Sequence, residues 1–134
     1  MKNPSDEKET IKKFSDLSAW QEGHRLVIQV YTITKFFPKE ELFGITNQIR
    51  RAVVSITSNI AEGFGRGTSQ DRVHFYIIAI GSLNEVQNQL LISKDIGYLN
   101  HTEWNELEKQ GIIVHKILSG LIRKSKSNLL SQIS

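Results

Sequence analysis

Apolar residues recur every three or four positions along most of the chain, which is the spacing of one face of an α-helix. Within residues 40–64 the series is Ile45, Ile49, Ala52, Val53, Ile56, Ile60 and Phe64. Within residues 100–126 it is Trp104, Leu107, Gly111, Val114, Leu118 and Leu121. No stretch alternates apolar and polar residues in the manner of a strand. The pattern therefore predicts an all-α protein.

Two further helices are predicted over residues 17–37 and about 68–96. The first carries two adjacent apolar lines, so its apolar face is wide enough to contact more than one neighbour. These lines are Leu26, Val30, Ile33 and Phe37, and Trp20, Val27 and Tyr31. The helix at 68–96 is apolar on nearly every side in its first half. We expect that half to be buried all round, with another subunit supplying part of the cover.

Residue types that start or stop helices lie between these four segments. Pro38 disfavours helical geometry in the residue before it and separates the first two helices. Helix starts are predicted at Asp16 or Ser18, at Thr68 or Ser69, and after Asn100. Helix ends are predicted at Gly63, Gly65 and Gly67 and at Gly97, because glycine readily takes the left-handed conformation of a helix C-cap.

Four helices joined by short connections describe an antiparallel up-down-up-down four-helix bundle. We expect the bundle at residues 14–126, between a flexible leader (residues 1–13) and a frayed C-terminal tail (residues 127–134). The length of 134 residues suits one domain. The absence of cysteine suits a reducing compartment. Its longest apolar run, Val73–Leu83, is about half the length that spans a bilayer, and no signal peptide is evident. We therefore expect a soluble, cytoplasmic protein.

Basic charge is concentrated in the last quarter of the chain. From residue 109 onward there are five basic residues and no acidic ones, although the net charge of the whole chain is only +3. Lys109, Lys116 and Arg123 are seven residues apart on the side of their helix opposite its apolar series, and Lys124 and Lys126 lie nearby. The cluster indicates either a surface for a polyanion or a solvated helix end stabilised by the helix dipole.

The position of the glycine cluster GFGRG (Gly63–Gly67) in the chain argues against a nucleotide-binding loop. It follows a helix, whereas a dinucleotide-binding loop follows a strand, and no GxxxxGK[ST] motif is present. Because a helix C-terminus repels phosphate, we expect a structural turn here. Only the next helix N-terminus at Thr68, beside Arg66 and Arg72, is placed to hold an anion.

Residues for catalysis or metal binding form no known pattern. There is no cysteine, no serine nucleophile elbow and no repeated Glu-x-x-His pair of a di-iron bundle. The four histidines share no spacing. We expect no enzyme activity, no catalytic residue, no metal and no cofactor.

A polar strip runs beside the apolar series of the second predicted helix. It consists of Gln48, Arg51, Ser55, Asn59 and Glu62. A buried polar group without a partner costs about 1–3 kcal/mol, so one interpretation is a hydrogen-bonded network that sets the register between helices or subunits. The other is a ligand or nucleic-acid contact made through the two adjacent arginines of this helix.

Several short motifs are specific in combination. They are Phe14–Trp20 (FSDLSAW), Phe37–Gly44 (FPKEELFG), Gln48–Ala52 (QIRRA), Ser55–Gly63 (SITSNIAEG), His74–Phe75, and Ala79–Leu83 (AIGSL) followed by Glu85. Over about residues 14–122 the chain resembles the four-helix-bundle family of 23S rRNA intervening-sequence proteins. The resemblance implies a bundle that assembles as a ring-like homopentamer and supplies no catalytic residue. The fold is also similar to that of the accessory variability determinant proteins of diversity-generating retroelements, basic pentamers that bind nucleic acid.

The favoured function is a non-enzymatic, homo-oligomeric bundle that binds RNA or single-stranded nucleic acid through basic surface patches. The candidate contact residues are Arg50, Arg51, Arg66, Arg72, Lys109, Lys116, Arg123, Lys124 and Lys126. The chain lacks a helix-turn-helix signature, an RNP motif and an evident aromatic stacking platform. The alternatives are a scaffold that binds a protein partner without contacting nucleic acid and, more remotely, a bundle that binds a small molecule or metal.

Overall fold

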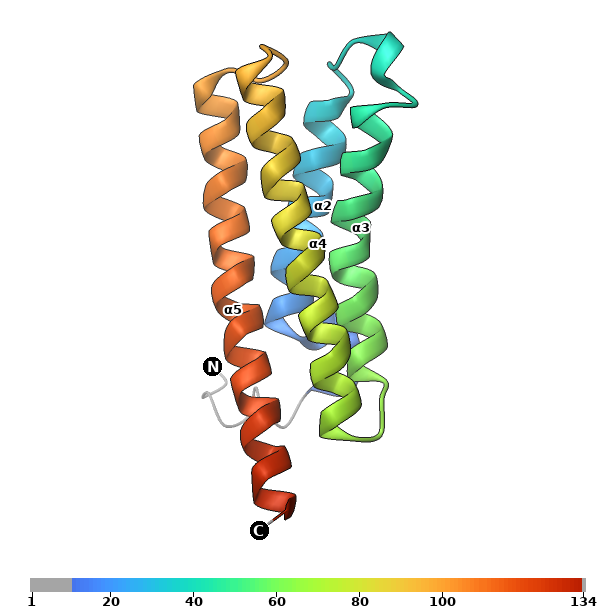
Figure 1. Cartoon of the computed structure of the whole chain (residues 1–134), viewed down its shortest axis with the longest axis vertical. Helices are drawn as coiled ribbons and strands as arrows, with labels where there is room; N and C mark the ends of the chain where they lie inside the picture. Colours follow the sequence, from blue (N-terminus) through green and yellow to red (C-terminus); the bar gives the residue numbers. More distant parts are fainter. Residues whose placement is uncertain (1–10, 134) are drawn as a thin grey trace, which may run out of the picture.

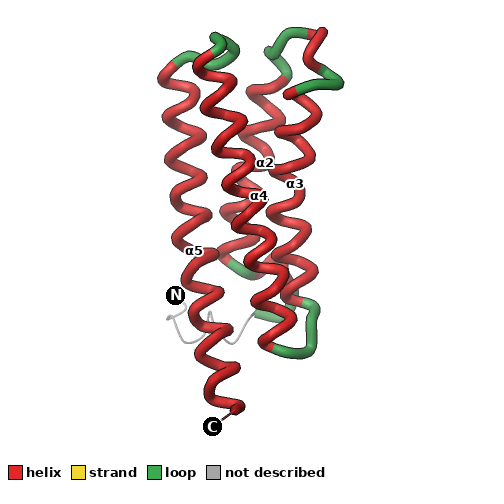
Figure 2. The backbone as a smooth tube through the Cα atoms, in the orientation of Figure 1, coloured by secondary structure: helices red, strands yellow, loops and turns green. Residues whose placement is uncertain are grey.

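The computed structural model of the protein describes the backbone of residues 11–133 and the side chains of residues 11–128. Four α-helices account for most of this length, and a short 3-10 helix precedes each of the first two (Figure 1). The elements in order are η1 (Phe14–Asp16), α2 (Ser18–Thr34), η2 (Lys39–Glu41), α3 (Ile45–Phe64), α4 (Ser69–Asp95) and α5 (His101–Ile133). No strand occurs between residues 11 and 133, so the predicted all-α class is confirmed (Figure 2).

The four α-helices form an antiparallel bundle in which each helix packs against two neighbours. Helix α3 lies between α2 and α4, and α5 closes the bundle by packing against both α4 and α2. Within the described part of the chain, the close backbone contacts between α-helices join only these neighbouring pairs. Successive helices run in opposite directions and are joined by short connections (Figure 1). This is the up-down-up-down bundle that the helix pattern predicts.

The core is built from the apolar series that the sequence shows. Leu26, Val30, Ile49, Val114 and Leu118 are fully buried, and the other members of the series are buried or partly buried with few exceptions. Seven polar residues are also buried among the described side chains: Thr34, Thr46, Thr57, Gln89, Ser93, Gln110 and Ser125. Most of the buried hydroxyls bond to carbonyl oxygens within their own helix, which the apolar pattern does not predict.

Two helix starts agree with prediction and one does not. The Thr68 hydroxyl accepts a hydrogen bond from the backbone of Asp71 (3.2 Å). Asn100 and Glu103 exchange side chain–backbone bonds of 2.8 and 2.9 Å in a capping box. The N-cap of α2 is Leu17, which makes no side-chain cap bond, so the prediction of Asp16 or Ser18 is wrong. The Asp16 carboxylate instead accepts bonds from the backbone amides of the two lysines at 12 and 13.

The glycines at the helix ends play different roles. Gly97 has φ +91° and is the only residue with positive φ in the described chain, so it closes α4 as a left-handed cap. Helix α3 ends at Phe64 as predicted, but its C-cap, Gly65, is right-handed (φ −77°), so the left-handed cap expected there is wrong. Gly63 is buried in the last turn of α3, where a β-carbon would lie 2.7 Å from the Tyr76 ring. Its physical role is to let α3 and α4 approach closely.

Helix α5 is longer than predicted, and so is the connection between α2 and α3. The sequence pattern ends the last helix near Lys126, whereas α5 continues to Ile133 and projects beyond the other helices (Figure 1). Residues 121–133 contain neither glycine nor proline, so nothing in the backbone chemistry stops the helix. At the other end, α2 stops at Thr34 and α3 starts only at Ile45. The predicted leader lies largely outside the described residues.

The outer side of α4 is not covered by the described residues of this chain. Tyr76, Ala79 and Leu83 on its inner side are buried, whereas Ile77 and Ile78 are 50% and 40% exposed. The expectation that the first half of α4 is buried all round is therefore not met within a single copy.

Candidate nucleic-acid interface

The basic stripe of α5 lies on the outer surface of the bundle. Lys109, Lys116 and Arg123 are all exposed, as their position opposite the apolar series predicts. Seven residues of α-helix rise about 10 Å, so the three charges form a line along the helix. No ion pair joins any of them to a described carboxylate. The stripe therefore presents unneutralised positive charge to solvent.

The C-terminal part of α5 adds two exposed lysines, Lys124 and Lys126, to this stripe. The helix dipole favours cations only within about the last turn of a helix. Because α5 runs to Ile133, its last turn contains no basic residue. The dipole therefore gives no explanation for this cluster.

Arg66 and Arg72 close the turn between α3 and α4. Arg66 pairs with Glu62 of the preceding helix turn and stacks its guanidinium over the Phe75 ring, 4.6 Å from the centroid. Arg72 donates from Nε to the backbone oxygen of Arg66 (2.8 Å). These contacts hold the turn that the glycine cluster makes and use part of the hydrogen-bonding capacity of both arginines.

Arg50 and Arg51 are adjacent in sequence but lie in different surroundings. Arg50 donates from Nε to the Thr34 hydroxyl (2.9 Å) and stacks over the Tyr31 ring, 4.9 Å from the centroid. Arg51 is exposed and lines a cleft of about 280 Å³ that Glu85 of α4 also lines. Arg50 lies fourteen residues before the end of α3 at Phe64, about 21 Å along the helix axis, and Arg66 lies beyond that end. The nine candidate contact residues thus fall into three separate groups.

Only part of the polar strip on α3 forms a network. The hydroxyls of Ser55 and Ser82 are 2.8 Å apart and link α3 to α4. Asn59 donates to the Ser55 carbonyl (2.8 Å) and hydroxyl (3.1 Å). Gln48, like Arg51 and Glu62 of the same strip, is exposed. The strip therefore supplies one link between helices, with a half-buried asparagine behind it.

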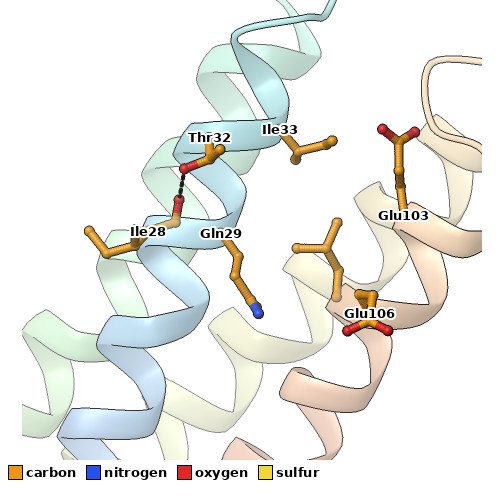
Figure 3. A pocket seen from close by; sticks show the side chains of 7 residues that line it. Ile28, Gln29, Thr32, Ile33, Glu103 and Glu106 are labelled. Carbon is orange, nitrogen blue, oxygen red and sulfur yellow. Dashed lines mark hydrogen bonds between the residues drawn. The ribbon is translucent and has the colours of Figure 1, made fainter.

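A second hollow, of about 330 Å³, lies between α2 and α5 (Figure 3). Its walls include Ile28, Ile33 and Leu107, and Thr32 bonds back to the Ile28 carbonyl (2.8 Å). Glu103 and Glu106 line the α5 side, so the hollow would repel a phosphate. It contains no pairing of a nucleophile with a base.

Histidines and carboxylates do not gather in the described part of the chain: no group of three or more there is placed to hold a metal ion. Among residues 11–133, no helix has the length and apolar character needed to cross a bilayer.

The architecture is that of a small α-helical bundle with one basic outer face. The chain matches the model of the 23S rRNA-intervening sequence protein family over residues 15–120, and it belongs to that family. Among solved structures it is similar to a protein of unknown function from the S23 ribosomal protein family of Bacteroides thetaiotaomicron. The two share 20% identity over 78% of this chain and 97% of that one, with a TM-score of 0.72. At this identity the likeness shows the fold. No match was found among curated proteins.

Proposed function

We propose that this protein is a non-enzymatic RNA-binding bundle whose main contact surface is the basic outer face of α5. The observation that carries the proposal is the exposed stripe of Lys109, Lys116 and Arg123, which has no described carboxylate partner and continues into Lys124 and Lys126. A strand of RNA running along this face meets a cation about every 10 Å. RNA and single-stranded DNA present the same phosphate backbone to such a surface.

Counterion release provides the affinity of such an interface. Each phosphate neutralised by a lysine or arginine releases condensed counterions, so affinity falls steeply as salt increases. Phosphate contacts of this kind position a nucleic acid without reading its sequence. We therefore expect strong salt dependence and little sequence preference from α5 alone. The absence of cysteine is consistent with a location in the cytoplasm, which is a reducing compartment and contains RNA partners.

The test is binding of labelled RNA and single-stranded DNA across a salt series. The triple variant Arg123→Gln/Lys124→Gln/Lys126→Gln should lower the slope of log affinity against log salt by up to about three. The matched control replaces Lys12, Lys13 and Arg25 with glutamine, which removes the same charge from other exposed positions. Negligible binding by the wild-type protein at low ionic strength would refute the proposal. Equal slopes for both variants would move the contact away from α5.

We further propose that the chain works as a homo-oligomer, with five copies as the resemblance implies. Support comes from α4, where Ile77 and Ile78 are exposed and Gly81 has nothing within 4 Å of a built β-carbon. A glycine inside a helix costs about 1 kcal/mol relative to alanine, and close approach by another copy is a reason to keep it. Light scattering behind a sizing column should give five times the 15.3 kDa chain mass. A 15.3 kDa species would refute the assembly.

A scaffold for another protein is the second candidate function. It is favoured by the exposed apolar residues Ile112 and Ile113 on α5, which flank the basic stripe. A protein contact on this face would use those isoleucines, whereas RNA would use Lys109 and Lys116, which precede and follow them along the helix. The salt series separates the two, because apolar contacts do not weaken as salt rises.

A further inference from the structure

The connection between α2 and α3 contains a pocket of about 340 Å³ at the end of the bundle remote from the C-terminus. Three cations line it: Lys35 at the end of α2, Lys39 of η2 and Arg50 of α3. No carboxylate is among the lining residues, and no described ion pair neutralises any of the three. The pocket therefore concentrates positive charge in a concave site.

Arg50 is held in place before any ligand arrives. Its Nε donates to the hydroxyl of Thr34, which itself donates to the carbonyl of Val30 (2.7 Å). Tyr31 supports the guanidinium from one side. This arrangement occupies Nε and leaves the two terminal nitrogens of Arg50, which have no hydrogen-bond partner among the described residues, for an anion. A guanidinium oriented in this way suits bidentate contact with a phosphate.

The pocket wall holds a second polar group without a partner. Thr46 lines the pocket in the first turn of α3, is 3% exposed, and has no hydrogen-bond partner for its hydroxyl within the described chain. The first turn of a helix also carries the positive end of its dipole. Two carboxylates, those of Glu40 and Glu41, precede this turn in η2, and neither lines the pocket. The Glu41 carboxylate accepts a hydrogen bond from Tyr98 (2.8 Å).

Two phenylalanines stand exposed beside the pocket. Phe43 is 91% exposed and Phe36 is 81% exposed, the highest values among the exposed large apolar residues of the described chain. Phe36 lies between the lining residues Lys35 and Phe37, and Phe43 follows the lining residue Leu42. An aromatic ring beside a phosphate site is a surface on which an unpaired base stacks. The two exposed rings are therefore candidates for the stacking platform that the sequence pattern does not reveal.

We propose that this pocket and the two phenylalanines form a second contact for single-stranded RNA, separate from the α5 stripe. A backbone phosphate sits between Lys35, Lys39 and Arg50, and the flanking bases stack on Phe36 and Phe43. The inference rests on the proposed RNA-binding function and extends it. The pocket with its two phenylalanines selects unpaired bases, whereas α5 contacts only the phosphate backbone. Duplex RNA, with its bases paired, has no base free to stack here.

The charge part is tested with a labelled oligouridylate across a salt series. Lys35→Gln/Lys39→Gln should lower the salt slope by up to about one, as expected for one phosphate contact, while the charge-matched control Lys12→Gln/Lys13→Gln should leave it unchanged. All four lysines are exposed, so neither variant disturbs the core. Wild-type affinity and slope in Lys35→Gln/Lys39→Gln would overturn this inference and leave the proposed function standing.

The stacking part is tested with Phe36→Ala/Phe43→Ala. Affinity for oligouridylate should fall between about fivefold and a hundredfold per stacked base with the salt slope preserved, and affinity for duplex RNA should not change. An equal loss on both RNAs would overturn the assignment to unpaired bases. A loss of oligomer mass with oligouridylate affinity preserved would show that the rings form a subunit contact, and would also overturn it.

Inorganic phosphate alone gives an independent measurement of the pocket. In a titration followed by two-dimensional NMR, phosphate should shift the amide signals of Lys35, Lys39 and Thr46 and the Nε–H signal of Arg50. Absence of these shifts would overturn the site. Shifts in a protein that binds no RNA would instead refute the proposed function and, with it, RNA as the occupant.

Discussion

Gly63 of α3 lies directly against the ring of Tyr76 on α4, so close that a β-carbon on Gly63 would stand 2.7 Å from ring atom Cε1 and 3.0 Å from Cδ1. Tyr76 is 2% exposed and cannot move outward without opening the core. The contact brings the two helices together at the turn that joins them.

We predict that Gly63→Ala destabilises the protein by about 1–3 kcal/mol, although alanine is the better helix former. The matched control is Gly120→Ala on α5, where the nearest atom to a β-carbon is the end of the Arg123 side chain at 3.7 Å. That variant should raise the free energy of unfolding by about 0.5–1 kcal/mol. Urea denaturation measures both changes. Equal changes in the free energy of unfolding for the two variants would show that α4 moves at Tyr76 to accommodate the added methyl group.

Gln110 of α5 reaches across to α2, where its amide donates to the backbone oxygen (2.9 Å) and the carboxylate (2.8 Å) of Glu22. Replacing it by glutamate puts two carboxylates together. We predict that Gln110→Glu lowers the free energy of unfolding at pH 7 by about 1–3 kcal/mol. The loss comes from repulsion between two like charges, so it should be smaller at low pH than at pH 7.

The control for this prediction is the exchange Glu22→Gln/Gln110→Glu, which restores one amide facing one carboxylate. Denaturation midpoints should return toward the wild-type value at pH 7. A double variant no more stable than Gln110→Glu would contradict the account.

Tyr98, on the α4–α5 connection, donates its hydroxyl proton to Glu41 of η2 (2.8 Å). This hydrogen bond is the main reason that the pKa of Tyr98 is raised, with burial and the charge of Glu41 acting in the same direction. A raised folded-state pKa means that the contribution to stability is present below the unfolded pKa of about 10 and is lost as pH rises through the folded value.

We therefore predict that the wild-type protein loses stability more steeply above pH 10 than Tyr98→Phe does. Burial also raises the pKa of Tyr76, and that contribution is common to both proteins and cancels in the comparison. Denaturation at several pH values between 8 and 11 supplies the measurement. Parallel curves would mean that the bond to Glu41 has no effect on folding.

The outer face of α4 should form the contact between subunits in the proposed oligomer. We predict that Ile77→Glu dissociates the proposed oligomer, because a carboxylate placed in an apolar subunit contact loses its hydration. The matched control is Ile28→Glu on α2, a residue of comparable exposure (54% against 50%) on another side of the bundle. Light scattering should report smaller particles for Ile77→Glu alone. Dissociation by Ile28→Glu alone would place the subunit contact on α2.

The helical pattern determined the architecture. Periodic apolar residues identify a buried face whichever partner covers it, so the four helices, the core series of α5 and the capping box at Asn100 followed from local chemistry. The outward position of Lys109, Lys116 and Arg123 followed from the same geometry, since a helix with one buried face has a defined opposite face.

Tertiary structure decided what depends on residues distant in sequence. Gly63 was predicted to be a left-handed cap, and only the position of Tyr76 shows that close packing requires it. Arg50 could not be separated from Arg51 until Thr34 was seen to hold it at a pocket. The physical reason is the same in both cases: periodicity records which side of a helix is buried, whereas the partner and distance of each side chain are set by how the helices pack.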